Sequence, residues 1–282
     1  MLKMKIENIL GIDLGGTNIR GGIVSTNGLS GVVSQRVNAN GSLEEVLNDL
    51  YNFIDPFFKT GIKAIGIGVP GLVSNAKVYD VINIPAWKEI SLQSLLGDRY
   101  QLPVAVNNDA NCFALGEFYF GKGKNADSMI GLTIGTGLGS GIIIHKKLYT
   151  GHNGGAGEFG MMEYRDQCYE YYGSGQFFQN VYGINGEEVF ANAKQGNKDA
   201  LKMYDEMGMH LGNAIKAIMY AMDVSLIVLG GSVRHAFPYF SRSMWQQIET
   251  FAYKRSIANL KIELSGLENS GILGAAALHY NI

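Results

Sequence analysis

The chain has 282 residues, and its 23 Lys and Arg residues nearly balance its 25 Asp and Glu residues, which gives a net charge of -2. With 46% hydrophobic residues it can bury one large core or two medium ones, which excludes a disordered chain and a coiled coil. The balanced charge, without a run of Lys or Arg, argues against a nucleic-acid partner, and the longest uncharged stretch, residues 128–144, is too polar to span a membrane.

The amino-terminal segment and the two cysteines limit the environment in which the chain works. Glu7 and Asp13 lie within what would have to be the apolar part of a secretion signal, so we expect a cytoplasmic protein. Cys112 and Cys168 are too few for a disulfide framework or a four-thiolate zinc site, so we expect no structural zinc. The 38 glycines are almost twice the ~7% of average usage, and they cluster in apolar runs. Such clusters indicate backbone that approaches something closely.

The first predicted strand opens an internal repeat. Residues 9–24 resemble residues 129–144, which lie 120 positions later, at both the glycine and the aliphatic positions. Each segment is typical of a strand, a glycine-rich turn and a second strand, that is, a β-hairpin whose turn exposes its amides. Two such hairpins suggest two similar α/β domains that face each other across a cleft; chance likeness between two glycine-rich strands is the alternative. The aligned glycines are Gly11 with Gly131, Gly15 with Gly135, and Gly21 with Gly141.

Helices alternate with short apolar strands in the rest of the chain, which predicts an α/β fold. The first hairpin is followed by a helix over residues 42–60, a strand over 64–69, an extended segment over 78–87 and a helix from 108 or 109 to 120. The second hairpin is followed by an irregular polar and aromatic region over 152–183, helices over 186–193 and 198–222, a strand over 226–229, a helix over 239–255, a strand over 261–264 and a last helix from 270.

Two matches to phosphate-binding patterns lack the context that the chemistry needs. Residues 66–71 fit GxGxxG after a strand, but the helix that a dinucleotide site requires does not follow. Residues 116–123 resemble a P-loop, but they follow a helix and have Gly123 where the magnesium-binding Ser or Thr belongs. Neither match predicts a nucleotide site.

The turns of the two hairpins predict such a site more convincingly. In residues 13–18 the carboxylate of Asp13 ends a strand, and bare amides and a hydroxyl follow, which are groups that hold Mg²⁺ and phosphate oxygens. Residues 135–139 offer a second cradle of amides without a carboxylate. One loop for a metal ion and one for an anion fit a nucleoside triphosphate.

At these residues the chain resembles the ROK family of sugar kinases and repressors, which have the actin/hexokinase-like ATPase fold. The resemblance extends over essentially the whole chain, and six motifs occur in the family's order. The family's DxGGTxxR resembles residues 13–20, its GxPG residues 68–71, its Asn-x-x-x-Trp residues 83–87, its Asn-Asp-x-Asn residues 108–111, its second phosphate loop residues 135–139, and its Gly-Ala-Gly-Glu-x-Gly-His residues 155–161.

Two departures from the family pattern bear on the site. Met161 stands where the family has a His that touches both metal and sugar, which leaves the sugar selectivity open. The family's CxCGxxGCxE zinc loop is shortened here, so that only Cys168 and Glu170 fit its final Cys-x-Glu. One thiol cannot assemble a zinc site, and the resemblance therefore implies a variant without zinc.

The resemblance implies a role for each candidate residue. Asp109 would be the catalytic base that accepts the proton of the sugar hydroxyl; the alternative is a helix N-cap, and both roles are compatible. The sugar would contact Gly71, Asn83, Asn108, Asp109, Glu158 and Glu170. Nucleotide and phosphates would contact Asp13, Gly15, Gly16, Thr17, Asn18, Gly135, Thr136, Gly137, Gly230 and Gly231, with Mg²⁺ held by Asp13 directly or through water.

The sequence thus predicts an ATP-dependent kinase that phosphorylates the hydroxymethyl group of a hexose. The alternatives are a kinase for an amino or N-acetylated hexose and a sugar-sensing regulator of the same family; a first strand by Ile9 leaves no room for a preceding helix-turn-helix. The expected architecture is a two-domain actin/hexokinase-like (ribonuclease H-like) α/β fold with a nucleotide and sugar cleft between the domains. Residues 1–112 form the smaller domain, to which a helix of about 270–282 returns, and residues 113–269 the larger. The family further implies a homodimer.

Overall fold

A computed structural model describes residues 7–81 and 83–280, and these residues form two compact units. The first unit takes the described residues up to Asn125, together with Gly141–Ala156 and the described residues from Gly266 onward. The second unit comprises Ala126–Ser140 and Gly157–Ser265. No helix among the described residues is both long and apolar enough to traverse a membrane.

The first unit is built on a five-stranded mixed sheet with the order β3-β2-β1-β4-β8. β1, β2 and β3 form an antiparallel meander, whereas β4 and β8 run parallel to β1. The expected first hairpin is therefore present, with its turn between β1 and β2. The strands are β1 (Ile9–Leu14), β2 (Asn18–Ser25), β3 (Gly28–Arg36), β4 (Ala64–Val69) and β8 (Val104–Asn108).

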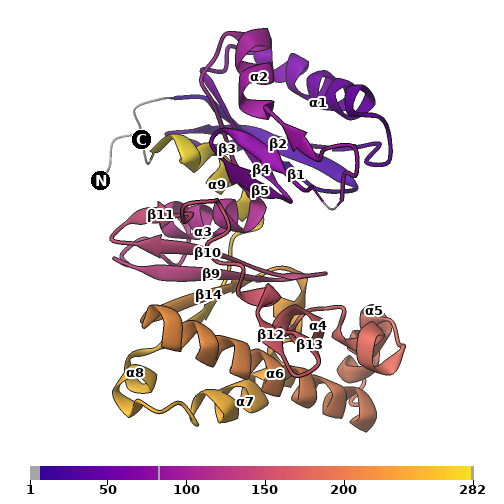
Figure 1. Ribbon diagram of the computed structural model, residues 1–282, viewed down its shortest axis with the longest axis vertical. Helices are drawn as coiled ribbons and strands as arrows, with labels where there is room; N and C mark the ends of the chain where they lie inside the picture. Colours follow the sequence, from indigo (N-terminus) through magenta and orange to yellow (C-terminus); the bar gives the residue numbers. More distant parts are fainter. Residues whose placement is uncertain (1–6, 82, 281–282) are drawn as a thin grey trace. The chain divides into compact units, whose positions relative to one another are not determined.

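One face of this sheet carries the larger hydrophobic core of the unit. Alternate strand residues such as Leu10, Ile12 and Ile67 are fully buried there against helices α1 (Leu43–Phe58) and α2 (Leu92–Tyr100), which Figure 1 shows above the sheet. α1 begins at a capping box, in which the Ser42 hydroxyl accepts from the amide of Glu45 and the Glu45 carboxylate accepts from the amide of Ser42.

On the opposite face, a helix rich in small residues, α9 (Ser270–Ala277), lies directly against the strands. A Cβ atom on Gly11 or Gly66 would collide with carbonyl groups of α9. α9 in turn packs on α3 (Asp109–Phe120), where Gly274 lies directly against the carbonyl oxygen of Cys112. Glycine is required at these positions because two backbones are in contact.

The remaining strands of the first unit are short. β5 (Leu72–Ser74), β6 (Lys77–Tyr79) and β7 (Glu89–Ile90) form a small antiparallel sheet, and β11 (Lys147–Tyr149) pairs with the end of β10. Among the described residues of the segment expected to be extended, 78–81 and 83–87, Val78 and Tyr79 belong to β6, and turns occur at residues 83, 85 and 86.

The second large sheet repeats the topology of the first. Its order is β11-β10-β9-β14-β15, with an antiparallel β10–β11 pair at one edge and β14 and β15 parallel to β9 at the other. The correspondence of order and direction with β3-β2-β1-β4-β8 supports the internal repeat. The boundary between the units falls within β10, after Ser140. The strands are β9 (Met129–Ile134), β10 (Leu138–Ile144), β14 (Leu226–Gly230) and β15 (Lys261–Leu264).

The longest helix of the second unit organises its other helices. α6 (Lys198–Met222) lies beside α7 (Phe237–Ile248) in Figure 1, and Gly212 lets it approach the carbonyl oxygen of Met244, which would lie 2.5 Å from an added Cβ. Two further helices are α5 (Gly186–Lys194) and α8 (Lys254–Asn259).

Three further regions differ from the elements expected from the sequence. The helix expected over residues 239–255 is instead two helices: α7 ends at Ile248, and α8 begins at Lys254 after a break in the helical structure. The irregular region over 152–183 contains several short elements: a 3-10 helix η1 (Phe159–Met161), a hairpin of β12 (Glu163–Tyr164) and β13 (Gln167–Cys168), helix α4 (Tyr169–Gly173) and a π-helical turn η2 (Phe178–Tyr182). The last helix, expected over about 270–282, ends at Ala277 and is followed by a 3-10 turn η4 (Leu278–Tyr280), while residues 281–282 lie outside the described part of the chain. The other expected helices and strands are confirmed to within about two residues.

The close packing of α3 and α9 predicts a large cost for one added methyl group. Gly274→Ala should lower the stability of the chain by about 1–3 kcal/mol or more, because the new Cβ meets backbone atoms of Cys112 that cannot move aside. Gly266→Ala is the matched control, since a Cβ there meets nothing within 4 Å. Urea denaturation of both variants measures the difference. Equal midpoints for the two variants would contradict the close contact.

Candidate functional site

The carboxyl ends of three parallel strands in the first unit form one row. Asp13 on β1 pairs with Gly68 on β4, and Gly68 pairs with Asn107 on β8. Because neighbouring strands lie about 4.8 Å apart, this register separates Asp13 from Asn107 by roughly 10 Å. Open α/β sheets bind ligands at such carboxyl ends, so we name this row and the loops that follow it the first half-site.

Asp13 is a partly buried carboxylate in this row. It points to the same face of the sheet as Gly11, where α9 lies close enough that a Cβ on Gly271 would be 3.1 Å from its Oδ2. Burial raises the pKa of Asp13, and the positive charge of its cross-strand neighbour Arg20 lowers it only in part. Arg20 is shared, since its guanidinium also donates to Asn269 at 2.8 Å. When this carboxylate is ionised, the protein therefore compensates its charge only in part.

The loop after Asp13 is a tight turn. The amide of Gly15 donates to the carbonyl of Asn18 at 2.9 Å, and the Thr17 and Asn18 side chains are exposed. Asn83 packs directly on this loop, because a Cβ on Gly16 would lie 2.5 Å from the Cβ of Asn83. The structure thus brings a predicted sugar residue and a predicted phosphate residue into contact.

Asn108 and Asp109 divide two roles at the start of α3. Asn108 is the N-cap, and its Oδ1 accepts from the amides of Ala110 at 2.9 Å and Asn111 at 3.3 Å. Asp109 is the first helical residue, and its Oδ1 shares the Ala110 amide at 2.8 Å. Asn108 also donates to the carbonyl of Gly71 at 3.3 Å, which joins two of the predicted sugar residues.

A buried thiol connects the two carboxylates of the first half-site. Burial raises the pKa of Cys112 well above its ordinary value, and the charges of Asp109 and then Asp13 raise it further. Both carboxylates therefore act on the same buried atom. The alignment of motifs predicted both residues, and the structure places them in one neighbourhood.

In the second unit, the turn between β9 and β10 forms the corresponding loop. The amide of Gly135 donates across the turn to the carbonyl of Gly137 at 3.0 Å, while the amide of Leu138 donates to Oε2 of Glu170 at 2.8 Å. A Cβ on Gly137 would lie 2.5 Å from the same carboxylate oxygen. The predicted phosphate loop and the predicted sugar carboxylate are therefore in direct contact.

Glu158 and Glu170 form the pair of carboxylates that the motifs predicted. Desolvation raises the pKa of Glu158, and the negative charge of Glu170 raises it further, so the two carboxylates sense each other. The loop that carries Glu158 is attached to β10, because the hydroxyl of Ser140 on that strand donates to the carbonyl of Gly157. A group that donates hydrogen bonds to both carboxylates would relieve this repulsion.

A cavity of about 520 Å³ in the second unit opens beside the same loop. Its walls combine aromatic and aliphatic side chains with a few polar ones, which is typical of sites for small organic ligands. Gly135 and Thr136 of the β9–β10 turn form part of its lining, while Phe178, Phe190 and Tyr204 contribute aromatic rings. We name the β9–β10 turn, the two carboxylates and this cavity the second half-site.

Gly231 directly follows β14, the strand that runs parallel to β9. It has a positive φ of 78°, and a Cβ there would collide with the backbone of Ile134 at the end of β9. Gly230 ends β14 beside Thr133, and the chain then enters the 3-10 helix η3 (Ser232–Ala236), which lines the cavity. The predicted pair Gly230 and Gly231 therefore does not line the cavity itself, whereas the residues that follow it in η3 do.

Several cavity residues have no signal in the sequence patterns. Phe178, Phe190, Tyr204 and His235 line the cavity from four separate elements, so no motif unites them. The five histidines lack ligand spacing, and the sequence therefore assigned His235 no role. Only the position of residues 232–236, directly after the predicted Gly230–Gly231 turn, could have indicated the wall that η3 forms.

The comparisons with known proteins agree with these motifs. The model of the ROK family matches residues 9–281, so the chain belongs to the ROK family. It is 27% identical to a glucokinase of Thermotoga maritima over 99% of this chain and 98% of that protein. It is also 27% identical to a xylose repressor of Caldicellulosiruptor bescii, over 97% of this chain and 78% of that protein.

A solved structure supports the same assignment of fold. The crystal structure of a ROK family glucokinase from Streptomyces griseus in complex with glucose and AMPPNP matches with a TM-score of 0.82 and 26% identity, over 96% of this chain and 98% of that chain. The chain has the mixed α/β architecture of ROK sugar kinases, which is the actin/hexokinase-like fold.

The shortened loop around Cys168 predicts a protein that contains no zinc. Within residues 7–81 and 83–280, no three His, Cys, Asp or Glu side chains are grouped so that they could hold a metal ion. Elemental analysis of the purified protein should find far less than one zinc per chain, and dialysis against a zinc-selective chelator should leave the melting temperature unchanged. One zinc per chain would show that Cys168 and Glu170 are aligned wrongly with the family loop.

Proposed function

We propose that this chain is a kinase that transfers the terminal phosphoryl group of ATP to the hydroxymethyl group of a hexose. The glucokinase among its relatives and the glucose and AMPPNP of the Streptomyces griseus complex support this activity and both substrates. The observation that carries the proposal is the position of Asp109. It follows the carboxyl end of β8 and begins α3, while Asn108 provides the cap of the helix.

The proposed role of Asp109 is that of general base. As the sugar oxygen forms its bond to the γ-phosphorus and the bond to the β-phosphate oxygen breaks, the Asp109 carboxylate takes the hydroxyl proton, and ADP leaves. The helix N-terminus favours the ionised carboxylate by about 0.3–1 kcal/mol, which keeps it ready to accept a proton. A loose transition state needs only a weak base.

The residues of the first half-site suit a magnesium ion that arrives with the nucleotide. Mg²⁺ is usually bound by one or two carboxylates together with waters and phosphate oxygens, so one carboxylate suffices. Asp13 is an oxygen ligand of the right chemistry, and its incompletely compensated charge favours a cation. When bound, the ion neutralises charge on the phosphates. Asp13 would hold it directly or through water, and the amide of Gly16 would face a phosphate oxygen, because the amide of Gly15 already donates to the carbonyl of Asn18 and holds the turn.

The cavity of the second half-site suits the nucleoside part of the donor. Its aromatic walls offer flat apolar surface to a base, and Asn185, Glu187 and His235 offer polar groups for the base edge and the ribose. Gly135, Thr136 and Gly137 would then face the phosphates. For the sugar, Glu158 and Glu170 are the proposed hydroxyl acceptors, with Gly71, Asn83 and Asn108 on the first half-site.

A sugar-sensing regulator is the second candidate, because a xylose repressor is among the relatives of the chain. A regulator needs the sugar residues but not a base or a nucleoside cavity. A panel of glucose, mannose, glucosamine, N-acetylglucosamine and N-acetylmannosamine in a coupled ADP-release assay distinguishes the candidates and names the hexose. Turnover of one hexose supports the kinase, whereas sugar binding without ADP release supports the regulator.

The proposed base predicts a separation of catalysis from binding. Asp109→Asn should lower kcat by about 10² or more, because an amide cannot accept the hydroxyl proton, while the affinity for the sugar stays nearly unchanged. Steady-state kinetics and calorimetric sugar binding measure the two quantities. Asp199→Asn, which changes an exposed acidic residue in the first turn of α6, is the matched control. Near-normal turnover of Asp109→Asn would remove the base from the mechanism.

Asp13 predicts opposite effects on activity and stability. Because the pKa of Asp13 is raised, the folded chain retains a proton that the unfolded chain releases near pH 3.8. The free energy of unfolding therefore falls as the pH rises from about 3.8 to the pKa of the folded state. Above that range, the ionised carboxylate destabilises the fold. Asp13→Asn should therefore raise the melting temperature by roughly 2–4 °C per kcal/mol gained and abolish ATP-dependent turnover.

The control for this prediction is a carboxylate with a partner. Asp55 pairs with Arg99 at 3.2 Å and accepts from the hydroxyl of Tyr100, so Asp55→Asn should not raise the melting temperature. Melting curves at pH 7 and magnesium titrations of activity test both variants. A lower melting temperature for Asp13→Asn, or unchanged magnesium dependence, would refute the assignment of Asp13.

A further inference from the structure

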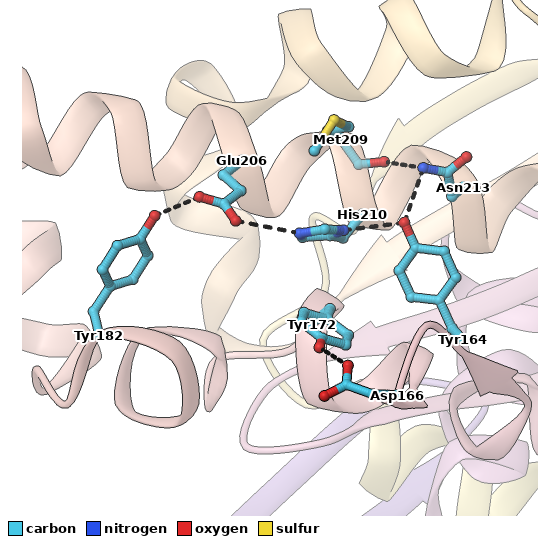
Figure 2. Close-up of polar contacts among 8 residues, drawn as sticks. All are labelled: Tyr164, Asp166, Tyr172, Tyr182, Glu206, Met209, His210 and Asn213. Carbon is cyan, nitrogen blue, oxygen red and sulfur yellow. Dashed lines mark hydrogen bonds and ion pairs between the residues drawn. The ribbon is translucent and has the colours of Figure 1, made fainter.

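A buried histidine of the second unit has no part in the reaction proposed above. His210 lies on α6 and is 0% exposed, and the rings of Tyr164, Tyr172 and Phe177 lie 4.9 to 5.8 Å from its ring. Figure 2 shows His210 between Glu206 on one side and Tyr164 on the other. A polar ring enclosed in this way is costly unless its nitrogens have partners, so its hydrogen bonds are informative.

The hydrogen bonds around His210 are all consistent with one arrangement of protons, which we assign to it. Asn213 donates from Nδ2 to the Tyr164 hydroxyl at 3.2 Å and to the carbonyl of Met209 at 3.0 Å. The Tyr164 hydroxyl accepts that bond, so its own hydrogen is available to His210 Nδ1 at 3.1 Å. Nδ1 is then the acceptor, and Nε2 carries the proton and faces Oε1 of Glu206 at 3.6 Å, which is longer than a hydrogen bond.

This arrangement requires a neutral imidazole. Burial lowers the pKa of His210 below its ordinary 6.5, the positive charge of Arg165 lowers it further, and Glu206 opposes both. A protonated ring would carry a hydrogen on Nδ1 and could no longer accept from Tyr164. The other titratable groups around the ring are paired with each other: Tyr182 donates to Glu206, and Tyr172 donates to Asp166.

The same residues hold the helix that carries Glu170. The ring of Tyr164 on β12 stacks on Tyr169 with centroids 4.5 Å apart and an angle of 19°, and Tyr169 begins α4. Tyr172, three residues later on α4, packs against His210. Glu170 lies between these two tyrosines in the sequence, and its carboxylate accepts a hydrogen bond from the amide of Leu138 at 2.8 Å. α4 has only five residues, so its place depends on these contacts.

We propose that His210 and Tyr164 are positioning residues for Glu170: their hydrogen bond holds α4 on α6 and thereby keeps the Glu170 carboxylate on the Leu138 amide, where it accepts a sugar hydroxyl. This inference rests on the sugar kinase function proposed above and adds two residues that act on the sugar through Glu170. It assigns them an effect on sugar affinity that is separate from nucleotide affinity.

The kinetic test removes one hydroxyl and keeps the ring. Tyr164→Phe should raise the KM for the sugar about tenfold, the usual effect of one lost hydrogen bond, with kcat and the KM for ATP within about twofold of wild type. Tyr171→Phe is the matched control, because Tyr171 lies on α4 itself but its hydroxyl donates to the carbonyl of Asn180 and not to His210. A role in stability alone would lower the active fraction, and hence kcat, without changing one KM. An unchanged sugar KM in Tyr164→Phe would overturn the proposal.

A second measurement does not depend on activity. The Leu138 amide reports on Glu170 directly, so its hydrogen exchange should be about tenfold faster in Tyr164→Phe and unchanged in Tyr171→Phe. If wild type phosphorylates a hexose but the Leu138 exchange is the same in both variants, the positioning role is wrong and the kinase stands. If no hexose is phosphorylated but Leu138 exchanges faster in Tyr164→Phe, the kinase is wrong and the positioning of Glu170 stands.

The pH dependence separates His210 from a passive filler of the core. Because its pKa lies below 6.5, His210 is neutral above that pH and becomes protonated as the pH falls further, so the sugar KM of wild type should rise on acidification. His210→Asn keeps an acceptor near the position of Nδ1 but cannot titrate. It should show a sugar KM near that of wild type at pH 7.5 and a smaller rise on acidification, because the Glu158 carboxylate, whose pKa is raised, titrates in both proteins. The same rise in His210→Asn would overturn the role of the imidazole.

Discussion

The contact of backbone with backbone at glycine is the constraint on which the rest of the first unit depends. Gly11 and Gly66 let α9 lie directly on β1 and β4, and Gly274 lets α9 lie on α3. Asp13 is two residues beyond Gly11 on the same face of β1, so the helix that these glycines admit also covers the carboxylate. The raised pKa of Asp13 is therefore a consequence of the packing.

This relation explains why a destabilising charge remains in a well-packed unit. When Asp13 is ionised, its carboxylate has lost hydration, and the positive charge of Arg20, which also donates to Asn269, compensates it only in part. The charge therefore destabilises the folded state, yet it is suited to a cation that arrives with phosphate. The rest of the row is uncharged: Gly68 follows on β4 and Asn107 on β8, whose Oδ1 accepts from Asn111 at 2.9 Å. Uncompensated charge is thus concentrated where the proposed chemistry needs it.

What the sequence predicted well are features that neighbouring residues determine. The two hairpins follow from glycine spacing and alternating aliphatic residues, and the helix at Asp109 from its cap, so each appears within a short window. The cavity beside the β9–β10 turn and the polar contacts around His210 could not be predicted in this way. Tyr164, Glu206 and Tyr182 come from a hairpin, a long helix and a π-helical turn, and only tertiary packing unites them. The region over 152–183 looked irregular because its elements have at most five residues each.

The two sheets show how one repeated topology can support two different roles. At the position equivalent to Asp13, 120 residues later, the second hairpin has Thr133, whose hydroxyl donates to the carbonyl of Gly139 at 3.2 Å within the same hairpin. The second hairpin thus satisfies its polar group internally and carries no charge of its own at that point. The carboxylate beside this hairpin is that of Glu170 on α4, which accepts a hydrogen bond from the amide of Leu138. The sheet fixes the position of Asp13, because Asp13 is part of a strand. Glu170 lies on a helix of five residues, so side-chain contacts must fix its position. That difference accounts for the dense aromatic and polar packing around His210 in the second unit.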